Sequence, residues 1–217
     1  KILEYKYKYQ DSTTIPTKTS VTELKIAPKK SDLKCAKFLK EDTETKITNA
    51  QKGTLIHLCM QKLDTQNKNY TYSQIKDLVQ DLENKKIITH KEAEAININK
   101  VYQFTKSKIW EEMIHAHAVH REKAFYISIP AKEVFDKELE EKILVQGVID
   151  LYYINEQNEL ILVDFKTDYV EDRNEQILVD KYNIQLELYK RALEDALQRK
   201  VDKVYIYSTY LEKEILI

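Results

Sequence analysis

Apolar and polar residues follow a helical period through much of the first half of the chain. Residues 3–9 alternate apolar and charged side chains, which predicts a strand exposed on one face, and the polar stretch 11–19 predicts a loop. Ser20 and Glu23 have the spacing of a capping box, so a short helix is expected to start there. Apolar residues then recur at helical spacing in four segments, each expected to form a helix: 53–63, 73–84, 91–104 and 109–114.

The pattern changes to that of strands in the second half. A polar turn at 155–158 joins two of the strand-like segments and predicts a hairpin between them. The three segments expected to form strands are 124–129, 142–154 and 159–167.

A long helix and a final strand complete the expected order. The helix carries Ile184, Leu188, Ala192 and Leu193 on one face, and residues 201–207 return to a strand pattern. A strand, a crossover helix and another strand imply a parallel pair. The expected fold is therefore α/β, with a core of helix, three strands, helix and strand around a mixed central sheet.

The length of 217 residues suits one sizeable core, and we expect a single domain over 1–217 with a helical insertion at about 68–115. No apolar run approaches the roughly 20 residues that span a bilayer, and no signal peptide opens the chain, so no membrane contact and a cytoplasmic location are expected. The first residue is lysine rather than methionine, which indicates a fragment or processed piece of a longer polypeptide.

Charge and cysteine content narrow the possible functions. Thirty-five basic residues against thirty-six acidic ones give a net charge of -1, so any contact with nucleic acid must be local. Cys35 and Cys59 are too far apart for a C-x-x-C pair and too few for a tetrathiolate cluster, so neither zinc nor an iron-sulfur cluster is expected. Two reduced, packed thiols are the expected state.

Glycine is scarce, and its two positions are therefore informative. Average usage predicts about 15 glycines in a chain of this length. Only Gly53 and Gly147 are present. We expect each of them where a side chain would not fit.

Asp164 and Lys166 follow an apolar stretch, 160–163, that is typical of a central strand. They share one face of that strand, and buried unpaired charges are costly, so they need partners or a ligand. The local pattern fits two interpretations equally: a mutual ion pair at the end of the strand, or part of a catalytic centre.

Asp150 favours the catalytic interpretation. It ends the preceding buried strand, and the hairpin brings it alongside Asp164. Two neighbouring carboxylates repel each other unless a cation lies between them, and hard oxygen ligands suit Mg²⁺ or Mn²⁺. The hypothesis requires that both carboxylates reach one common cation.

Three further polar residues are ambiguous. His57 lies among the apolar residues of the first core helix, where a histidine is more often a packing residue than a ligand; as a ligand it would favour tolerance of Mn²⁺. Gln185 and Tyr189 lie four apart on the long helix and could present an amide and a hydroxyl to a phosphate. Without further context a stripe facing solvent is the better interpretation of that pair.

Four motifs stand in order along the chain: Gly53-Thr-Leu-Ile-His57, Gly147-Val-Ile-Asp150, Asp164-Phe-Lys-Thr167 and Gln185-x-x-x-Tyr189. Together they resemble the RecB-type branch of the PD-(D/E)XK nucleases, which implies a restriction-endonuclease-like core. Residues 15–25 and Arg121-Glu-Lys-Ala-Phe125 are similar to the C-terminal nuclease domains of the AddA family of bacterial helicase-nucleases. The likeness covers nearly the whole chain. The four-cysteine iron-sulfur staple of several relatives is absent from the sequence.

The resemblance assigns roles to individual residues. It implies that His57, Asp150, Asp164 and the Phe165 backbone carbonyl bind Mg²⁺ or Mn²⁺, and that Lys166 orients or activates the attacking water. It also implies that Gln185 and Tyr189 position the scissile strand. Glu122 matches a family position, but no role is assigned to it.

The same resemblance implies an exonuclease that hydrolyses single-stranded DNA during double-strand-break repair and recombination. The 3'-ended strand would be delivered by a helicase portion of the same chain, with an AddB-type partner subunit. Two rival hypotheses stay open: a catalytically silent nuclease fold that docks a helicase complex, and a plain scaffold whose charges pair among themselves. The sequence does not determine strand polarity or exonuclease against endonuclease action.

Overall fold

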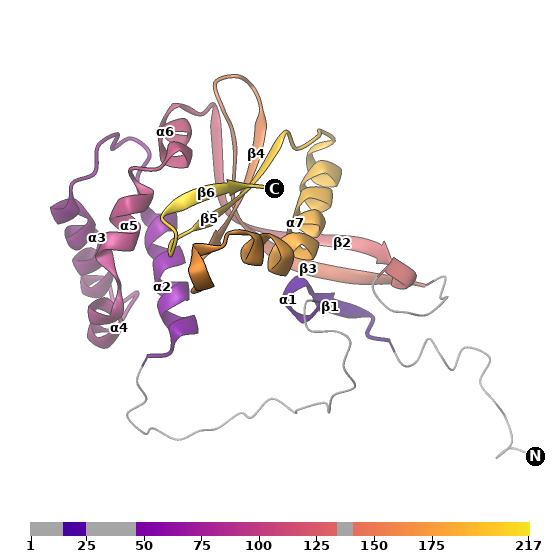
Figure 1. The fold of residues 1–217 in the computed structure, drawn as a ribbon, viewed down its shortest axis with the longest axis horizontal. Coiled ribbons are helices and arrows are strands. Elements are labelled where there is room, and N and C mark those ends of the chain that lie inside the picture. Colours follow the sequence, from indigo (N-terminus) through magenta and orange to yellow (C-terminus); the bar gives the residue numbers. More distant parts are fainter. Residues whose placement is uncertain (1–14, 25–46, 134–140) are drawn as a thin grey trace, which may run out of the picture.

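The structure is a computed structural model that describes residues 15–24, 47–133 and 141–217 (Figure 1). The predicted strand at 3–9 and Cys35 lie outside the described residues. The elements are β1 (Lys18–Ser20), α1 (Val21–Leu24), α2 (Asn49–Lys62), α3 (Tyr72–Asn84), α4 (His90–Ala95), α5 (Ile98–Phe104), α6 (Lys108–His115), β2 (Ala118–Pro130), β3 (Lys142–Ile154), β4 (Leu160–Lys166), α7 (Gln176–Leu197), β5 (Lys203–Ser208) and β6 (Lys213–Leu216), with 3₁₀ turns at Ala131–Glu133 and Glu171–Arg173.

The described strands form one mixed sheet of six, in the order β1-β3-β4-β5-β6 with β2 on the other edge of β3. β2 pairs with β3 along its whole length, so β1 and β4 must share the opposite edge. β1 runs parallel to residues 144–146, and β4 runs antiparallel to residues 151–154. Residues 147–150 of β3 thus lie in a gap between β1 and β4, where the sheet splits.

One face of the sheet is covered by helices α2 to α6 (Figure 1). Each of α2, α3 and α4 begins with a capping box. The side chain of a threonine before the helix accepts from the N–H of the third helical residue, and the side chain of that residue accepts from the threonine N–H. Burying large apolar side chains is the main stabilisation of this layer. Its fully buried centre contains Trp110, Phe104, Met60, Ile75 and Tyr207.

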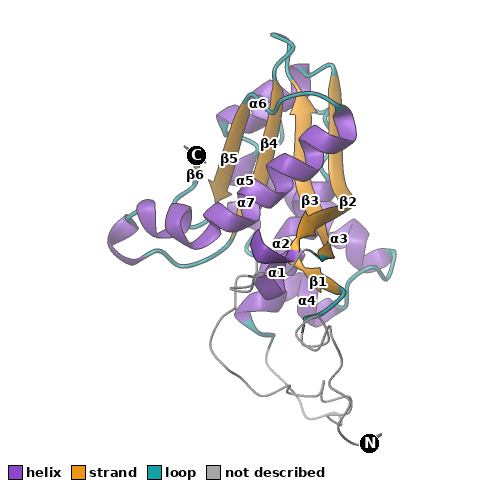
Figure 2. Cartoon of the chain, turned by 90° about the vertical axis from the view of Figure 1, so that its right-hand side faces the viewer, coloured by secondary structure: helices purple, strands orange, loops and turns teal. Residues whose placement is uncertain are grey.

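The other face is covered by α7 and the short α1, and α7 crosses in front of the strands in Figure 2. The Ser20–Glu23 capping box is confirmed: the Glu23 N–H donates to Ser20 Oγ, and the Ser20 N–H donates to Glu23 Oε2. The crossover helix and the parallel β4–β5 pair are also confirmed. The core order of helix, three strands, helix and strand follows as predicted from the chain.

Side chains of the same parity in the β2–β3 pair point to one face of the sheet in the first part of β3 and to the other face in its last part. Odd-numbered residues of β3 pack with α7 up to residue 149 and with α2 from residue 151. The change falls at Glu122 and Asp150, which lie opposite each other between the Arg121–Leu151 and Lys123–Ile149 pairs. Glu122 has a φ of 49°, a left-handed conformation that is strained for a residue with a side chain.

Three sequence predictions need correction. The single helix at 91–104 is two helices, because residues 96–97 are extended and Asn97 caps α5 by accepting from the Lys100 N–H. The strand expected at 124–129 begins at Ala118. Ile184 does not face the core: it is 62% exposed, while Gln185 beside it is buried.

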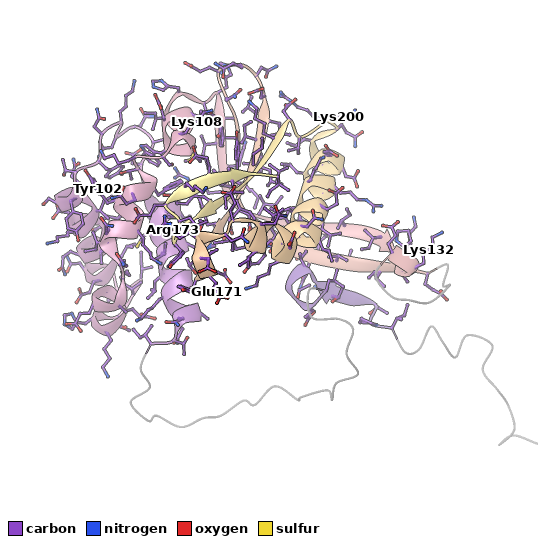
Figure 3. All side chains as sticks on the ribbon, viewed as in Figure 1. Tyr102, Lys108, Lys132, Glu171, Arg173 and Lys200 are labelled. Carbon is purple, nitrogen blue, oxygen red and sulfur yellow. The ribbon has the colours of Figure 1, made fainter. Side chains whose placement is uncertain are left out.

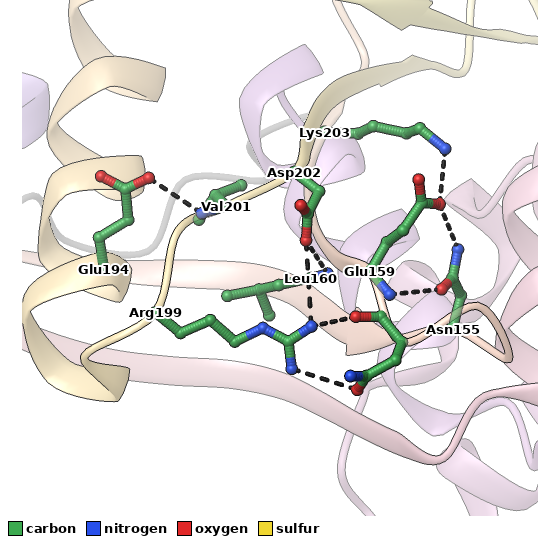
Figure 4. Close-up of polar contacts among 9 residues, drawn as sticks. Asn155, Glu159, Leu160, Glu194, Arg199, Val201, Asp202 and Lys203 are labelled. Carbon is green, nitrogen blue, oxygen red and sulfur yellow. Dashed lines mark hydrogen bonds and ion pairs between the residues drawn. The ribbon is translucent and has the colours of Figure 1, made fainter.

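Polar side chains tie together the hairpin turn and the start of β5 (Figure 4). The Asn155 amide donates to Glu159 at 2.8 Å, and Lys203 donates to the same carboxylate at 2.6 Å. The Leu160 N–H donates to Asp202 Oδ2 at 2.7 Å, which fixes the first residue of β4 against β5. These contacts set the register of β4, the strand that carries Asp164.

Among the described helices, none is both long enough and apolar enough to cross a membrane.

Candidate active site

A cavity of about 440 Å³ lies between α2 and the split in the sheet. Because α2 packs over β3 and β4, it brings His57 close to Asp150 within β3 and to the end of β4, which carries Lys166. The polar residues that line the cavity include His57, Gln61, Glu122, Asp150, Lys166 and Asp168. It is the place where the first three sequence motifs meet.

His57, Glu122 and Asp150 form a group that fits a divalent metal ion. One ligand atom from each lies within 4.8 Å of the others. One imidazole and two carboxylates are donors that Mg²⁺ and especially Mn²⁺ accept. The three residues come from α2, β2 and β3, so the fold, rather than local sequence, assembles the group.

Asp150 is held in place from two sides. Its Oδ2 accepts a 2.8 Å hydrogen bond from the Phe165 N–H and lies 3.6 Å from His57 Nδ1. Burial favours the neutral carboxyl, but His57, Lys166 and the Phe165 N–H outweigh it and lower the pKa of Asp150. In an extended strand the N–H and C=O of one residue point to the same side, so the Phe165 carbonyl also faces the Asp150 edge.

The imidazole of His57 responds to the same charges. Burial by itself favours its neutral form, but Asp150 and the more distant Asp164 raise its pKa above the ordinary value. Its ring also packs edge-on against Phe165, with centroids 5.7 Å apart. His57 is therefore oriented by the two strands that it faces.

Asp164 is 1% exposed and lies outside the His57, Glu122 and Asp150 group. Its Oδ2 forms an ion pair with Lys166, and its Oδ1 accepts a 3.2 Å hydrogen bond from Gln185. Burial, together with the charge of Asp150, raises the pKa of Asp164 despite the nearby ammonium. That one cation reaches both Asp150 and Asp164 stays a prediction.

Lys166 connects the buried Asp164 with the cavity that it lines. Its ammonium pairs with Asp164 and lies 4.3 Å from the centroid of the Tyr182 ring. The Tyr182 hydroxyl in turn donates to Asp168 at 2.8 Å. The amine is thus held at the cavity wall by an acid and an aromatic face.

Gln185 and Tyr189 are buried, so the interpretation of a stripe facing solvent is wrong. The Gln185 amide donates to Asp164 and, at 2.7 Å, to the Tyr189 hydroxyl. Both side chains therefore face the acidic centre from α7. Their contact with a scissile strand stays a prediction.

Both glycines lie at close approaches, as expected from their scarcity. A Cβ at Gly53 would lie 2.7 Å from Thr167 Oγ1, so this glycine lets α2 pack directly against the residue after β4. A Cβ at Gly147 would lie 2.6 Å from the Phe125 ring and 3.2 Å from Tyr189. Gly147 makes room for a side chain of this protein, and neither glycine has a positive φ.

Glu122 is the site residue whose role the sequence did not reveal. It joins the metal-ligand group from its strained position opposite Asp150. Burial and the charge of Asp150 raise the pKa of Glu122. Its position opposite Asp150 in the antiparallel pair would have indicated a role in the site. The strand, however, was expected to begin at residue 124, two residues after Glu122.

The split mixed sheet, the crossover helix and an acidic cavity beside a buried Asp-Lys pair together define a nuclease-type domain. A family description, the PD-(D/E)XK nuclease superfamily, matches residues 26–215 of the sequence. The chain belongs to this superfamily.

Similar sequences occur in bacterial proteins that are named as ATP-dependent helicase/nuclease subunits of the AddA type. The chain is 39% identical over 223 residues to that of Clostridium kluyveri, and 35% identical over 221 residues to that of Thermoanaerobacter sp. strain X514, in each case over 94% of this chain. It is 33% identical over 246 residues to that of Clostridium perfringens strain SM101, over 99% of this chain. The chain spans only 18–19% of the length of these relatives.

Proposed function

We propose that this chain is a metal-dependent nuclease that hydrolyses phosphodiester bonds of single-stranded DNA. The observation that carries the proposal is the convergence of His57, Glu122 and Asp150 on one cavity that Lys166 also lines. A fold that served only for docking would have no physical need to gather these ionisable groups beside the buried Asp164–Lys166 pair.

His57, Glu122, Asp150 and the Phe165 carbonyl would hold Mg²⁺ or Mn²⁺, with Asp164 completing the site from the neighbouring strand. A divalent cation bound there supplies a Lewis acid that polarises a phosphoryl oxygen. Around it, Asp150 is kept anionic by the Phe165 N–H and His57, as its lowered pKa indicates. Asp150 is therefore able to donate to a cation at neutral pH.

Lys166 would orient the attacking water and offset the negative charge that builds on the phosphate in the transition state. Asp164 holds the ammonium at the cavity wall, and Gln185 holds Asp164. The chain of contacts from α7 to Lys166 fixes the amine before substrate arrives, which is the arrangement that electrostatic catalysis requires.

The relatives' names combine a helicase and a nuclease, and we propose the same context for this chain. A helicase portion of the same polypeptide would deliver a single strand, specifically the 3'-ended one, during double-strand-break repair. An AddB-type subunit would be the partner, and exonucleolytic cutting would follow from delivery of a strand end.

The direct test incubates the chain with end-labelled single-stranded DNA in Mg²⁺, in Mn²⁺ and with EDTA. We expect cleavage in either metal, none with EDTA, and a loss of at least about a hundredfold in Lys166→Ala. Lys203→Ala is the matched control, because Lys203 also pairs with a carboxylate but does so at the far end of the sheet. Cleavage by Lys166→Ala at the wild-type rate would remove Lys166 from the mechanism.

Metal binding separates an active nuclease from a plain scaffold without relying on turnover. Calorimetric titration with Mn²⁺ should show a site that Glu122→Gln and Asp150→Asn each weaken. A chain that binds Mn²⁺ but cuts no DNA would instead support the silent docking module, and absence of binding would support the scaffold.

A further inference from the structure

A second cavity of about 850 Å³ opens directly beside the catalytic cavity. The two share four lining residues, Ala50, Gly53, Thr167 and Asp168. These shared residues place the two cavities side by side. The second cavity, called here the tyrosine groove, is the larger of the two by about a factor of two.

The far end of the tyrosine groove is aromatic. Tyr169, on the loop after β4, is 72% exposed, and its ring meets that of Tyr210 edge-to-face at 4.9 Å. Arg173, labelled in Figure 3, donates to the Leu211 carbonyl at 3.2 Å, and this bond holds the loop of Tyr169 against the turn that carries Tyr210. The Tyr169–Tyr210 ring pair is therefore held in place, although the Tyr169 ring faces solvent.

The walls of the tyrosine groove carry cations and amides. Lys52 and Asn49 project from α2, and Lys100 and Asn97 come from α5 and its N-cap. Ammonium groups and amide N–H groups are donors that contact phosphates without selecting a sequence.

Two carboxylates also line the tyrosine groove, and each has partners of its own. Asp168 accepts from Lys181 at 2.5 Å and from the Tyr182 hydroxyl at 2.8 Å, and these donors lower its pKa although burial alone would raise it. Glu94 lies on an exposed helix at the rim, with its Oε1 3.4 Å from His90 Nε2. The interior of the groove is therefore suited to an anionic ligand with flat rings.

We propose that the tyrosine groove binds the single-stranded DNA that flanks the scissile phosphate, with a base stacked on Tyr169 and phosphates near Lys52 and Lys100. The proposal rests on the proposed nuclease function and extends it to a substrate site next to the cavity. Alternating stacking and phosphate contacts are how proteins hold single strands without sequence preference. The net charge of -1 makes such a local site necessary.

The binding test uses a fluorescent oligothymidylate with EDTA present, so that no cleavage occurs. Tyr169→Ala should bind about tenfold more weakly, as expected for loss of one stacked base. Tyr169→Phe should bind like the wild type, because the ring is kept. Lys52→Ala with Lys100→Ala should reduce the slope of log affinity against log salt by about 1.4, or roughly 0.7 for each phosphate that is no longer neutralised.

Tyr72 provides a matched control. It is exposed, meets Tyr102 edge-to-face at 5.8 Å and lies beside Lys76, but it does not line the groove. Tyr72→Ala and Lys76→Ala should leave both affinity and salt slope unchanged. The proposal is overturned if Tyr169→Ala binds as tightly as Tyr72→Ala, an outcome that would leave the groove to a protein segment instead.

Hydrolysis separates this proposal from the proposed function. A nitrophenyl ester of thymidine monophosphate carries no flanking nucleotides, so Tyr169→Ala should cut it at the wild-type rate while its KM for the oligonucleotide rises about tenfold. An unchanged oligonucleotide KM would overturn the groove and leave the nuclease intact. If the wild type cuts neither substrate, the nuclease proposal fails. The binding measurements in EDTA still determine whether the tyrosine groove binds single-stranded DNA.

Discussion

The Gln185 side-chain amide donates to Asp164 Oδ1 at 3.2 Å from a buried position on α7. This bond makes Gln185 a positioning residue for the acid that holds Lys166. In Gln185→Leu we expect kcat to fall about tenfold or more, as for other residues that orient a metal ligand, with no change in DNA affinity. Steady-state kinetics and EDTA binding measure the two quantities.

Ile184→Ala is the control for that variant, since the side chain lies next along the same helix but is exposed. It should leave kcat and affinity unchanged. A weaker affinity in Gln185→Leu, with kcat retained, would show that Gln185 contacts the DNA strand rather than orienting Asp164.

Gly147→Ala should destabilise the fold, because the new Cβ would lie 2.6 Å from the Phe125 ring. We expect a loss of about 1–3 kcal/mol in the free energy of unfolding, measured by urea denaturation. Phe125→Leu in the same chain should recover part of that loss, since the two sites share one contact. Simple additivity of the two substitutions would contradict the close approach, and Val148→Ala, at an exposed neighbour, serves as control.

Arg121 ties the end of α2 to β2. Its Nη1 donates to the Gln61 carbonyl at 3.1 Å and to the Leu63 carbonyl at 2.7 Å, both at the negative end of the helix. Arg121→Met should cost about 1.5–3 kcal/mol of unfolding free energy, the range for hydrogen bonds to a charged group. Lys123→Met, an exposed position on the same strand, should change stability by less than about 0.5 kcal/mol; equal effects would exclude the capping role.

Cys59 gives a pH-dependent test of packing. Burial raises the pKa of its thiol to about 12. The folded pKa is above the unfolded one, so this stabilisation is complete below the unfolded pKa, near 8.5, and is lost as pH rises toward about 12.

The measurement is iodoacetamide labelling of Cys59 in a Cys35→Ser background, followed by mass spectrometry. At pH 8 the native chain should label far more slowly than the same chain in guanidinium, because only the thiolate reacts. Equal rates in both conditions would mean that the thiol is accessible in the folded state.

The sequence predicted the elements whose side chains are apolar at regular spacing. The strand at 142–154 has the predicted bounds, and the parallel return after the long helix follows from chain order alone. Asp150 and Asp164 were found because each follows apolar residues within a strand, where a charged side chain is conspicuous.

The same logic failed where polar residues replace the pattern. Near its start, β2 carries Arg121, which bonds to the end of α2, and Glu122, which lines the cavity, so no apolar alternation marks the strand. On α7 the buried Gln185 replaces an apolar residue, and the exposed Ile184 was wrongly assigned to the buried face; Leu188, Ala192 and Leu193 do pack on the core as predicted. Polar residues of the site occupy positions that would otherwise be apolar, so the hydrophobic pattern from which burial is predicted is lost there.

The β2–β3 pair contributes to both hydrophobic layers, because its buried side changes at Glu122 and Asp150. Neither layer can come apart without disturbing strands that the other needs, so the two should melt together in a single cooperative transition. The metal-ligand carboxylates lie at the pivot of that change. A ligand that binds them in the folded state should therefore stabilise both layers together and raise the melting temperature of the whole domain.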